Sequence, residues 1–281
     1  MELSPTLYPG GFLGSDPDSY DLDELACNFL PGGHVVLDLT SHCNLKCVYC
    51  HQSRPDFRGA HIKNEILDRL MDEFVSVGIA SLRFGTEGEA TIYKGWEKYA
   101  QFLSEKGISV SFLSNLSRPY NAVQIDALAH AAELTISFDS YDADLHAAIR
   151  RKSEIQVMTE NLRSILARAL ALGKKPRVTH NCVVSAHNLP TLLDLVARAP
   201  ENGIDRIGLM YMIKSFELED GGLNPIPLDV MSTKDQLLAA AQVYAAINLG
   251  RRLGVEVILS TLLAEMVEDF RFGNPSTGAL A

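Results

Sequence analysis

Short runs rich in β-branched and apolar residues alternate with segments of helical period along most of the chain, and this alternation restricts the fold more than any other feature. Six such runs stand at HVVLDL (34–39), ASLRF (80–84), ISVSFL (108–113), ELTISF (133–138), RVTHNCVV (177–184) and RIGLMYM (206–212). Strands separated by amphipathic helices form βαβ units with right-handed crossovers, and such units build a parallel sheet. A seventh run, VEVIL (255–259), follows a helix expected over 234–249 and fits either another strand or a cover for the sheet.

Six βα units predict an α/β fold, a partial (β/α)6 TIM-type barrel of parallel strands with an N-terminal extension. Polar residues follow nearly every strand, which favours a barrel because all strand ends of a barrel face one opening. The competing topology, an open doubly wound sheet, would gather them at one switch point. We expect the extension over residues 1–33, which are rich in proline and glycine, and the barrel over 34–260. A C-terminal helix or tail is expected over 261–281, where an extension missing from this chain would begin.

The charge balance argues against partners that attract cations. The sequence has 25 Lys and Arg against 35 Asp and Glu, which gives a formal net charge of −10. A chain of this charge has no general attraction to phosphate backbones or anionic lipid surfaces, so we expect neither a nucleic acid nor a membrane as a partner. The first residues show neither a basic leader nor an apolar signal core, and we therefore expect a cytoplasmic protein.

Three of the five cysteines fall within eight residues, directly after the first expected strand. Cys43, Cys47 and Cys50 form a C-x3-C-x2-C loop, a spacing that suits a metal site better than a disulfide framework. A [4Fe–4S] cluster normally takes four protein ligands, so three thiolates on one loop would leave one iron open. The alternative is a zinc site or a structural group of cysteines, with His42 or His51 as a fourth ligand.

This loop resembles the cysteine motif of the radical S-adenosylmethionine (radical SAM) superfamily, and the resemblance extends over the barrel from about residue 33 to 260. It implies a [4Fe–4S] cluster whose open iron is chelated by S-adenosylmethionine (SAM). One electron would then cleave SAM to methionine and a 5′-deoxyadenosyl radical that abstracts hydrogen from a substrate. The resemblance also implies a reducing electron-transfer protein, a flavodoxin or ferredoxin. The barrel motifs resemble most the peptide- and protein-modifying branch, which often carries a SPASM-type extension for auxiliary clusters.

After the second strand, GTEGEATIY resembles the GGEP motif of the same superfamily at Gly88 and Glu89. Two positions depart from that motif, since Glu87 replaces a glycine and Ala90 replaces the proline. The resemblance implies that Glu89 binds the amino group of SAM and that Gly88 lets the backbone approach the cofactor closely. A solvated acidic turn is the alternative interpretation.

The resemblance implies five further cofactor contacts: Tyr49, Asn115, Ser137, Arg150 and Asn181. Asn115 lies in LSNLS, which resembles the TNG stretch of the family with Leu116 in place of the glycine. Ser137 lies in ISFDS, which resembles SLDG, and Ser137 and Arg150 match positions that bind the ribose and the carboxylate of SAM. Asn181 lies where the family often contacts adenosine. Ordinary turn chemistry for Asn115 and a solvated helix position for Arg150 are the alternatives.

Two regions bear on the substrate. Alternation along the fifth strand puts Asn181 and Cys182 on opposite faces, so if Asn181 faces the barrel interior, Cys182 faces the helices. This placement favours a buried small hydrophobe for Cys182, with a cysteine that donates a hydrogen atom as the alternative. At the end of the sixth strand, Tyr211 and Lys214 are the candidates for the substrate pocket, with core packing by the neighbouring methionines as the alternative.

The sequence thus predicts a radical SAM enzyme and leaves its substrate class open. Peptide (RiPP) or natural-product modification comes first. A small-molecule substrate, such as an amino acid, nucleoside or sugar, follows closely, because no cysteine after Cys182 could bind auxiliary clusters. A non-catalytic iron–sulfur or zinc-binding scaffold is the third alternative, although a scaffold would not require Glu89, Ser137, Arg150 and Asn181.

Overall fold

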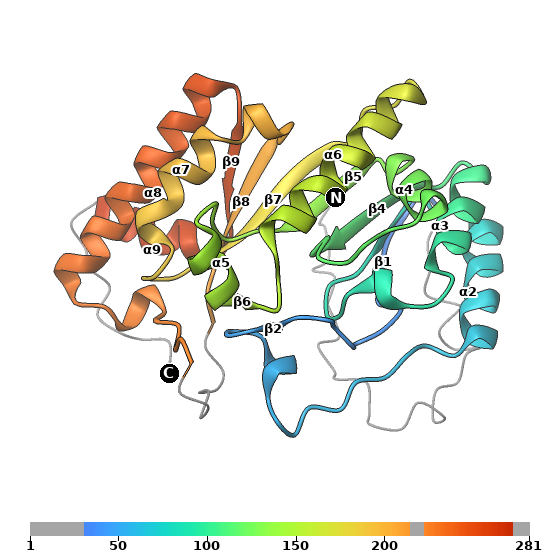
Figure 1. Ribbon diagram of the computed structural model, residues 1–281, viewed down its shortest axis with the longest axis horizontal. Helices are drawn as coiled ribbons and strands as arrows, with labels where there is room; N and C mark the ends of the chain where they lie inside the picture. Colours follow the sequence, from blue (N-terminus) through green and yellow to red (C-terminus); the bar gives the residue numbers. More distant parts are fainter. Residues whose placement is uncertain (1–30, 214–221, 272–281) are drawn as a thin grey trace, which may run out of the picture.

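The computed structural model describes residues 31–213 and 222–271, so the extension expected over residues 1–33 lies almost entirely outside the described residues. The described part contains a seven-stranded sheet in the order β1-β3-β4-β5-β7-β8-β9 (Figure 1). The strands are β1 His34–Leu37, β3 Ser81–Phe84, β4 Ser109–Ser114, β5 Glu133–Ser137, β7 Arg177–Val184, β8 Arg206–Tyr211 and β9 Glu256–Leu259.

Every neighbouring pair in this sheet is parallel. The strands follow one another across the sheet in the order in which they occur along the chain, so the sheet winds in one direction without a switch point. This order confirms the α/β partial barrel and excludes the doubly wound alternative. A separate two-stranded antiparallel ribbon joins β2 (Lys46–Cys47) to β6 (Arg150–Arg151).

The sheet has one strand more than the six that we predicted, because the run at 255–259 is a strand and not a cover. β9 pairs with β8 from Arg206 opposite Glu256 to Leu209 opposite Leu259. Val257 and Leu259 pack against the core, whereas the alternate residues of β9 are exposed. This alternation is typical of a strand that is covered on one face.

Helices cover the outer face of the sheet (Figure 1). The α-helices are α2 Asn64–Val77, α3 Trp96–Glu105, α4 Ala122–Ala129, α5 Ala143–Ile149, α6 Ile155–Ala171, α7 Leu192–Ala197, α8 Thr233–Leu253 and α9 Thr261–Arg271. Short 3-10 turns lie at η1 His51–Ser53, η2 Ala90–Ile92, η3 Leu189–Thr191, η4 Pro200–Asn202 and η5 Leu228–Val230. Alternate strand residues such as Leu82 and Phe84 are buried beneath the helices. Within the described residues, none of these helices is long and apolar enough to cross a membrane.

The helix ends follow signals that are visible in the sequence. Helix α2 stops at Gly78, whose φ of +73° lies in the left-handed region and whose amide donates to the carbonyl oxygens of Phe74 and Val75. Glycine adopts this conformation without steric cost, which is why it ends the helix and releases the chain toward β3.

The two ends of the barrel differ in what they carry. The cysteine loop follows β1, and the stretch with Glu89 follows β3, so both lie at the C-terminal ends of their strands. At the opposite end, a cavity of about 830 Å³ is lined by strand starts such as His34, Ser109 and Arg177. The polar motifs therefore gather at the end where parallel-strand folds place their functional loops.

Candidate functional site

The cysteine loop is attached to the barrel through the ribbon of β2 and β6. Cys47 lies directly opposite Arg150 in this ribbon. Next to that pair, the amide of Val48 donates to the carbonyl oxygen of Ile149 at 2.9 Å. The loop is thus held, between its first and last cysteines, by the segment that follows helix α5.

The three thiols lie in a poorly solvated place. Cys47 is buried, and Cys43 and Cys50 are half-buried. Burial raises the pKa of Cys43 to about 11, with a smaller increase from the charge of Glu89. Burial raises the pKa of Cys47 to about 12, although the charge of Arg150 opposes this shift. Without a bound cation these thiols keep their protons at neutral pH, so metal loading would release protons.

The donor set fits a cubane cluster by its chemistry. Within residues 31–213 and 222–271, no group of three or more His, Cys, Asp or Glu side chains forms a ready site for a metal ion. Both histidines considered as a fourth zinc ligand have other partners. His51 pairs with Glu87 at 3.2 Å, and His42 packs against His61 with 4.7 Å between ring centroids. Three thiols on one loop remain, which suits three irons of a cluster and leaves the fourth for an external ligand.

Glu89 is a buried carboxylate that accepts hydrogen bonds on both of its oxygens. Its side chain accepts from the hydroxyls of Thr91 (2.7 Å) and Ser114 (2.9 Å) and from the amide of Asn115 (2.7 Å). Only 2% of the residue is exposed, and burial raises its pKa while these hydrogen bonds oppose the shift. The alternative of a solvated acidic turn is therefore wrong. An anionic group held so firmly beside Cys43 suits a cationic ligand group.

Gly88 is required because two backbone segments approach each other closely here, while its expected approach to the cofactor stays a prediction. A Cβ at this position would collide with the carbonyl oxygens of Thr40 and His42, the latter at 2.6 Å. The amide of Glu89 also donates to the His42 carbonyl oxygen at 2.9 Å. The close approach that needs glycine is thus between this bend and the backbone that leads into the cysteine loop.

Asn115 and Leu116 join the end of β4 to the same loop. The Asn115 amide nitrogen Nδ2 donates to Oδ1 of Asn44 at 3.0 Å and lies 3.6 Å from Sγ of Cys43. Leu116 has a φ of +48°, in the left-handed region that favours glycine, and its side chain is buried. The backbone thus adopts at Leu116 a conformation for which glycine is the usual residue, while the leucine fills the core.

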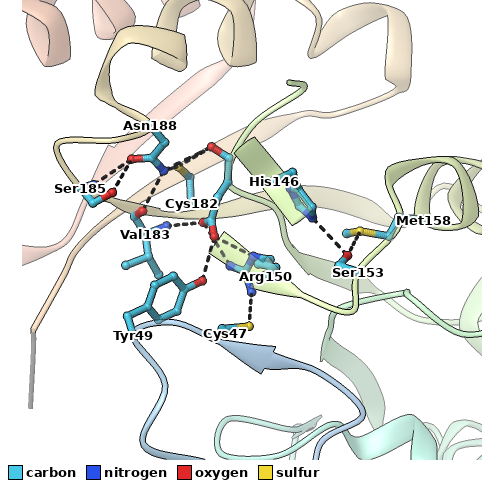
Figure 2. A network of polar contacts seen from close by, with 11 residues as sticks. Cys47, Tyr49, His146, Arg150, Ser153, Met158, Cys182, Val183, Ser185 and Asn188 are labelled. Atoms are coloured by element: carbon cyan, nitrogen blue, oxygen red, sulfur yellow. Dashed lines mark hydrogen bonds and ion pairs between the residues drawn. The ribbon is translucent and has the colours of Figure 1, made fainter. Parts of the chain in front are cut away.

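Arg150 is buried and paired, so the alternative of a solvated helix residue is wrong. Its Nε lies 2.8 Å from Oδ2 of Asp139, and its Nη2 donates to Oδ1 at 3.1 Å. Nη1 lies 3.9 Å from Sγ of Cys47, and the guanidinium carbon is 5.6 Å from the centre of the Tyr49 ring. Figure 2 shows Arg150, Cys47 and Tyr49 close to one another.

Asp139 is the residue of this site that sequence reasoning missed. It is fully buried, and it also accepts from the hydroxyl of Tyr49 at 2.8 Å. The sequence feature that could have indicated it is the aspartate of ISFDS, which follows β5. This aspartate lies at the same end of the barrel as the cysteine loop. A carboxylate after a strand is also ordinary turn chemistry, so the sequence does not single it out.

Ser137 and Asn181 lie side by side on the inner face of the barrel. They are opposite each other in the register of β5 and β7, and Asn181 is opposite Gly208 of β8. A Cβ at Gly208 would lie 3.2 Å from Oδ1 of Asn181, so the amide side chain covers that glycine. On the other face Cys182 is fully buried, with Nδ2 of Asn188 at 3.4 Å from its Sγ, as the alternation predicts.

The candidate substrate residues are only partly described. The half-buried Tyr211 shares a side-chain hydrogen bond with Asp229, and burial is the main cause that raises its pKa. Lys214 lies outside the described residues. Met212 is buried, as the core-packing alternative expects.

Comparisons with known proteins bear on the family and the fold of the chain. A family model described as the Radical SAM superfamily matches residues 37–185. GTP 3′,8-cyclase of Lactiplantibacillus plantarum is 24% identical over 69% of this chain and 60% of that protein. Mycofactocin maturase MftC of Mycobacterium ulcerans is 24% identical over 60% of this chain and 44% of that protein.

Among solved structures, Streptococcus suis SuiB bound to S-adenosylmethionine superposes with a TM-score of 0.59 at 16% identity. The match covers 82% of this chain and 50% of SuiB. SuiB has also been solved bound to the precursor peptide SuiA. The chain thus spans about half the length of the proteins that it resembles.

Proposed function

The chain belongs to the radical SAM superfamily, whose members use a [4Fe–4S] cluster and SAM, and from that premise we propose that it is a radical SAM enzyme that modifies a peptide. When bound, the cluster and SAM supply one-electron cleavage of SAM to methionine and a 5′-deoxyadenosyl radical that takes a hydrogen atom from the substrate. The observation that carries the proposal is the three-cysteine loop held beside buried Glu89 and Arg150.

Each residue of the site has a role in this proposal. Cys43, Cys47 and Cys50 bind three irons. Glu89 accepts hydrogen bonds from the amino group of SAM, and Arg150 donates to its carboxylate. Gly88 brings the Glu89 bend against the cysteine loop. Four further residues surround the cofactor in this proposal: Tyr49, Asn115, Ser137 and Asn181.

The inner face of the barrel supports binding of the nucleoside part of SAM. Within the described residues, the side chains of Ser137 and Asn181 have no hydrogen-bond partner, although both belong to the sheet. Both side chains are half-buried, so their polar groups are open to a ligand on the inner face of the barrel. We assign them to the ribose and adenine, as the resemblance implies.

Relatives support a peptide as the substrate. MftC is named as a maturase, and SuiB has been solved with a precursor peptide. A small molecule is the second candidate, because several curated relatives are GTP 3′,8-cyclases. Incubation with precursor peptides or with GTP, followed by mass spectrometry for loss of hydrogen or a new bond, separates the two.

The decisive experiment is anaerobic reconstitution with iron and sulfide, followed by dithionite and SAM. We expect 5′-deoxyadenosine by liquid chromatography and mass spectrometry. Cys43→Ala, Cys47→Ala and Cys50→Ala should each lose the cluster but keep the circular dichroism spectrum of the barrel, whereas Cys182→Ala should keep its iron.

A reconstituted sample with a full complement of iron that yields no 5′-deoxyadenosine would contradict the proposed activity. Zinc in the freshly purified protein, with no uptake of iron, would support the scaffold alternative. In the cell, a flavodoxin or ferredoxin takes the place of dithionite in this proposal, and the three thiols suit the reducing cytoplasm. Replacing dithionite by a reduced flavodoxin in the same assay tests the electron donor.

A further inference from the structure

Asp139 contacts Tyr49, Arg150 and Val183, three residues from separate segments that Figure 2 shows close together. Its Oδ2 accepts from the hydroxyl of Tyr49, in the loop itself, and pairs with Nε of Arg150, both at 2.8 Å. Its Oδ1 accepts from Nη2 of Arg150 at 3.1 Å and from the amide of Val183, in β7, at 2.8 Å. Asp139 itself follows β5 and is fully buried. Both oxygens of this carboxylate are therefore used by donors that come from separate parts of the chain.

The pairing fixes the direction of the Arg150 guanidinium. Nη2 donates to Oδ1 of Asp139, and Nε lies 2.8 Å from Oδ2 as an ion pair and, within the described residues, without a hydrogen bond of its own. Because the guanidinium is planar and rigid, the remaining N–H groups on Nη1 have a set direction. Nη1 lies 3.9 Å from Sγ of Cys47. The edge that Asp139 leaves open is therefore the one beside the cysteine loop.

The pair also makes the buried arginine possible. The Arg150 side chain is 6% exposed and the Asp139 side chain is not exposed at all. A buried cation without a partner is strongly destabilising, so Arg150 needs a counter-charge to lie against the thiols. In this arrangement Asp139 supplies the charge from the side away from Cys47.

We propose that Asp139 is a positioning residue of the cofactor site, which acts by directing the free edge of Arg150 toward Cys47 and toward the carboxylate of SAM bound beside it. The inference rests on the proposed function, since it gives Arg150 the role of binding that carboxylate. In this inference Asp139 affects SAM binding only through Arg150. The effects of substituting the two residues on SAM affinity should therefore not be additive.

The test compares SAM binding by reconstituted wild type, Asp139→Asn, Arg150→Gln and the double variant. SAM affinity is measured from the change that SAM causes in the electron paramagnetic resonance spectrum of the reduced cluster. In Asp139→Asn an NH2 group replaces one carboxylate oxygen and faces the N–H and O–H groups from which that oxygen accepted. Arg150 is then no longer held in its direction, so we expect SAM affinity to fall by about tenfold or more. Arg150→Gln should weaken binding similarly. The double variant should bind SAM within about twofold of Arg150→Gln, because Asp139 acts through the arginine.

Two further measurements keep the test decisive. Asp205→Asn is the matched control, since Asp205 also accepts a strand amide, that of Val178 at 2.9 Å, but lines the cavity at the opposite end of the barrel. It should bind SAM like the wild type. If Asp139→Asn does not fold because Arg150 loses its counter-charge, the double variant removes that charge and carries the comparison with Arg150→Gln.

The outcomes separate this inference from the proposed function. Wild-type affinity in folded Asp139→Asn would overturn the inference, and so would a double variant that binds SAM much more weakly than Arg150→Gln. A wild-type cluster whose spectrum does not respond to SAM would instead contradict the proposed function.

Discussion

Glu89 and Asp139 are two carboxylates that the fold buries near the same loop with different partners. Asp139 faces a guanidinium and forms a neutral pair. Glu89 accepts only from neutral hydroxyl and amide groups, and burial raises its pKa. No cationic side chain is among these partners of Glu89, so a cationic ligand group would supply the counter-charge that Asp139 obtains from Arg150.

We predict that Glu89→Gln separates stability from SAM binding. The substitution removes hydrogen bonds that the carboxylate accepts, but it also removes a buried charge. Because these two effects offset each other, the free energy of unfolding should change by no more than about 1 kcal/mol. SAM affinity should fall by more than about tenfold, because no charge remains for the amino group.

Urea unfolding and titration of the reconstituted variant with SAM check this prediction. The control is Glu87→Gln at the neighbouring exposed carboxylate, which pairs with His51 at the surface and should change neither quantity. Unaltered SAM affinity in Glu89→Gln would rule out the role assigned to Glu89.

At the scale of elements, the site is assembled where three connections meet. The cysteine loop after β1, the Glu89 bend after β3 and the β2–β6 ribbon contact one another through backbone hydrogen bonds, such as that from Glu89 to His42. These connections approach so closely that Gly88 has no room for a side chain. The register between loops is thus set by backbone packing and not by the polar side chains alone.

We predict that Gly88→Ala destabilises the protein and reduces cluster loading. The methyl group would collide with the carbonyls of Thr40 and His42, and relief of that overlap shifts the Glu89 bend away from the cysteine loop at a cost of about 1 to 3 kcal/mol. Iron content per chain after reconstitution and urea unfolding measure the two effects.

Gly107→Ala is the control for that prediction. Gly107 has a φ of +79° but no atom near its absent Cβ, so alanine there adds backbone strain of about 1 kcal/mol without touching the site. It should lower stability and leave iron loading unchanged. Full iron loading in Gly88→Ala would show that the close approach does not control the cysteine loop.

At the scale of the whole molecule, the barrel is incomplete and carries buried polar groups on both sides of its sheet. Behind the site, His180 stacks on Phe138 with 4.4 Å between ring centroids, and His146 lies 3.2 Å from the hydroxyl of Ser153. Burial lowers the pKa of His180 to about 3 and that of His146 to about 4. Both histidines are therefore neutral in the folded protein over the physiological range.

We predict that stability falls as the pH drops below about 6.5. Because the folded-state pKa values are depressed, the unfolded chain takes up protons first, so the stabilisation is complete above the unfolded pKa and is lost from there toward pH 3 to 4. Each histidine should contribute a loss of about 1.4 kcal/mol between pH 7.5 and 5.5. Urea unfolding at the two pH values measures it.

His180→Phe should reduce the loss of unfolding free energy between the two pH values by the contribution of one histidine. The reason is that the ring stack with Phe138 remains while the titrating group is removed. His34→Phe, at the exposed start of β1, is the matched substitution and should leave the pH dependence as it is in the wild type. An equal pH dependence in His180→Phe and in the wild type would contradict the assignment.

The sequence by itself determined the strands, the parallel barrel and the cysteine loop, because these depend on local periodicity and on spacing along the chain. It left β9 undecided, since a short apolar run fits a strand or a cover, and only pairing with β8 distinguishes them. Tertiary structure alone decided the burial of Glu89 and Arg150, the close backbone approach at Gly88 and the pairing of Asp139 with Arg150. These depend on contacts between residues far apart in the sequence, such as Tyr49 and Asp139, and no local pattern encodes which donors meet a buried carboxylate.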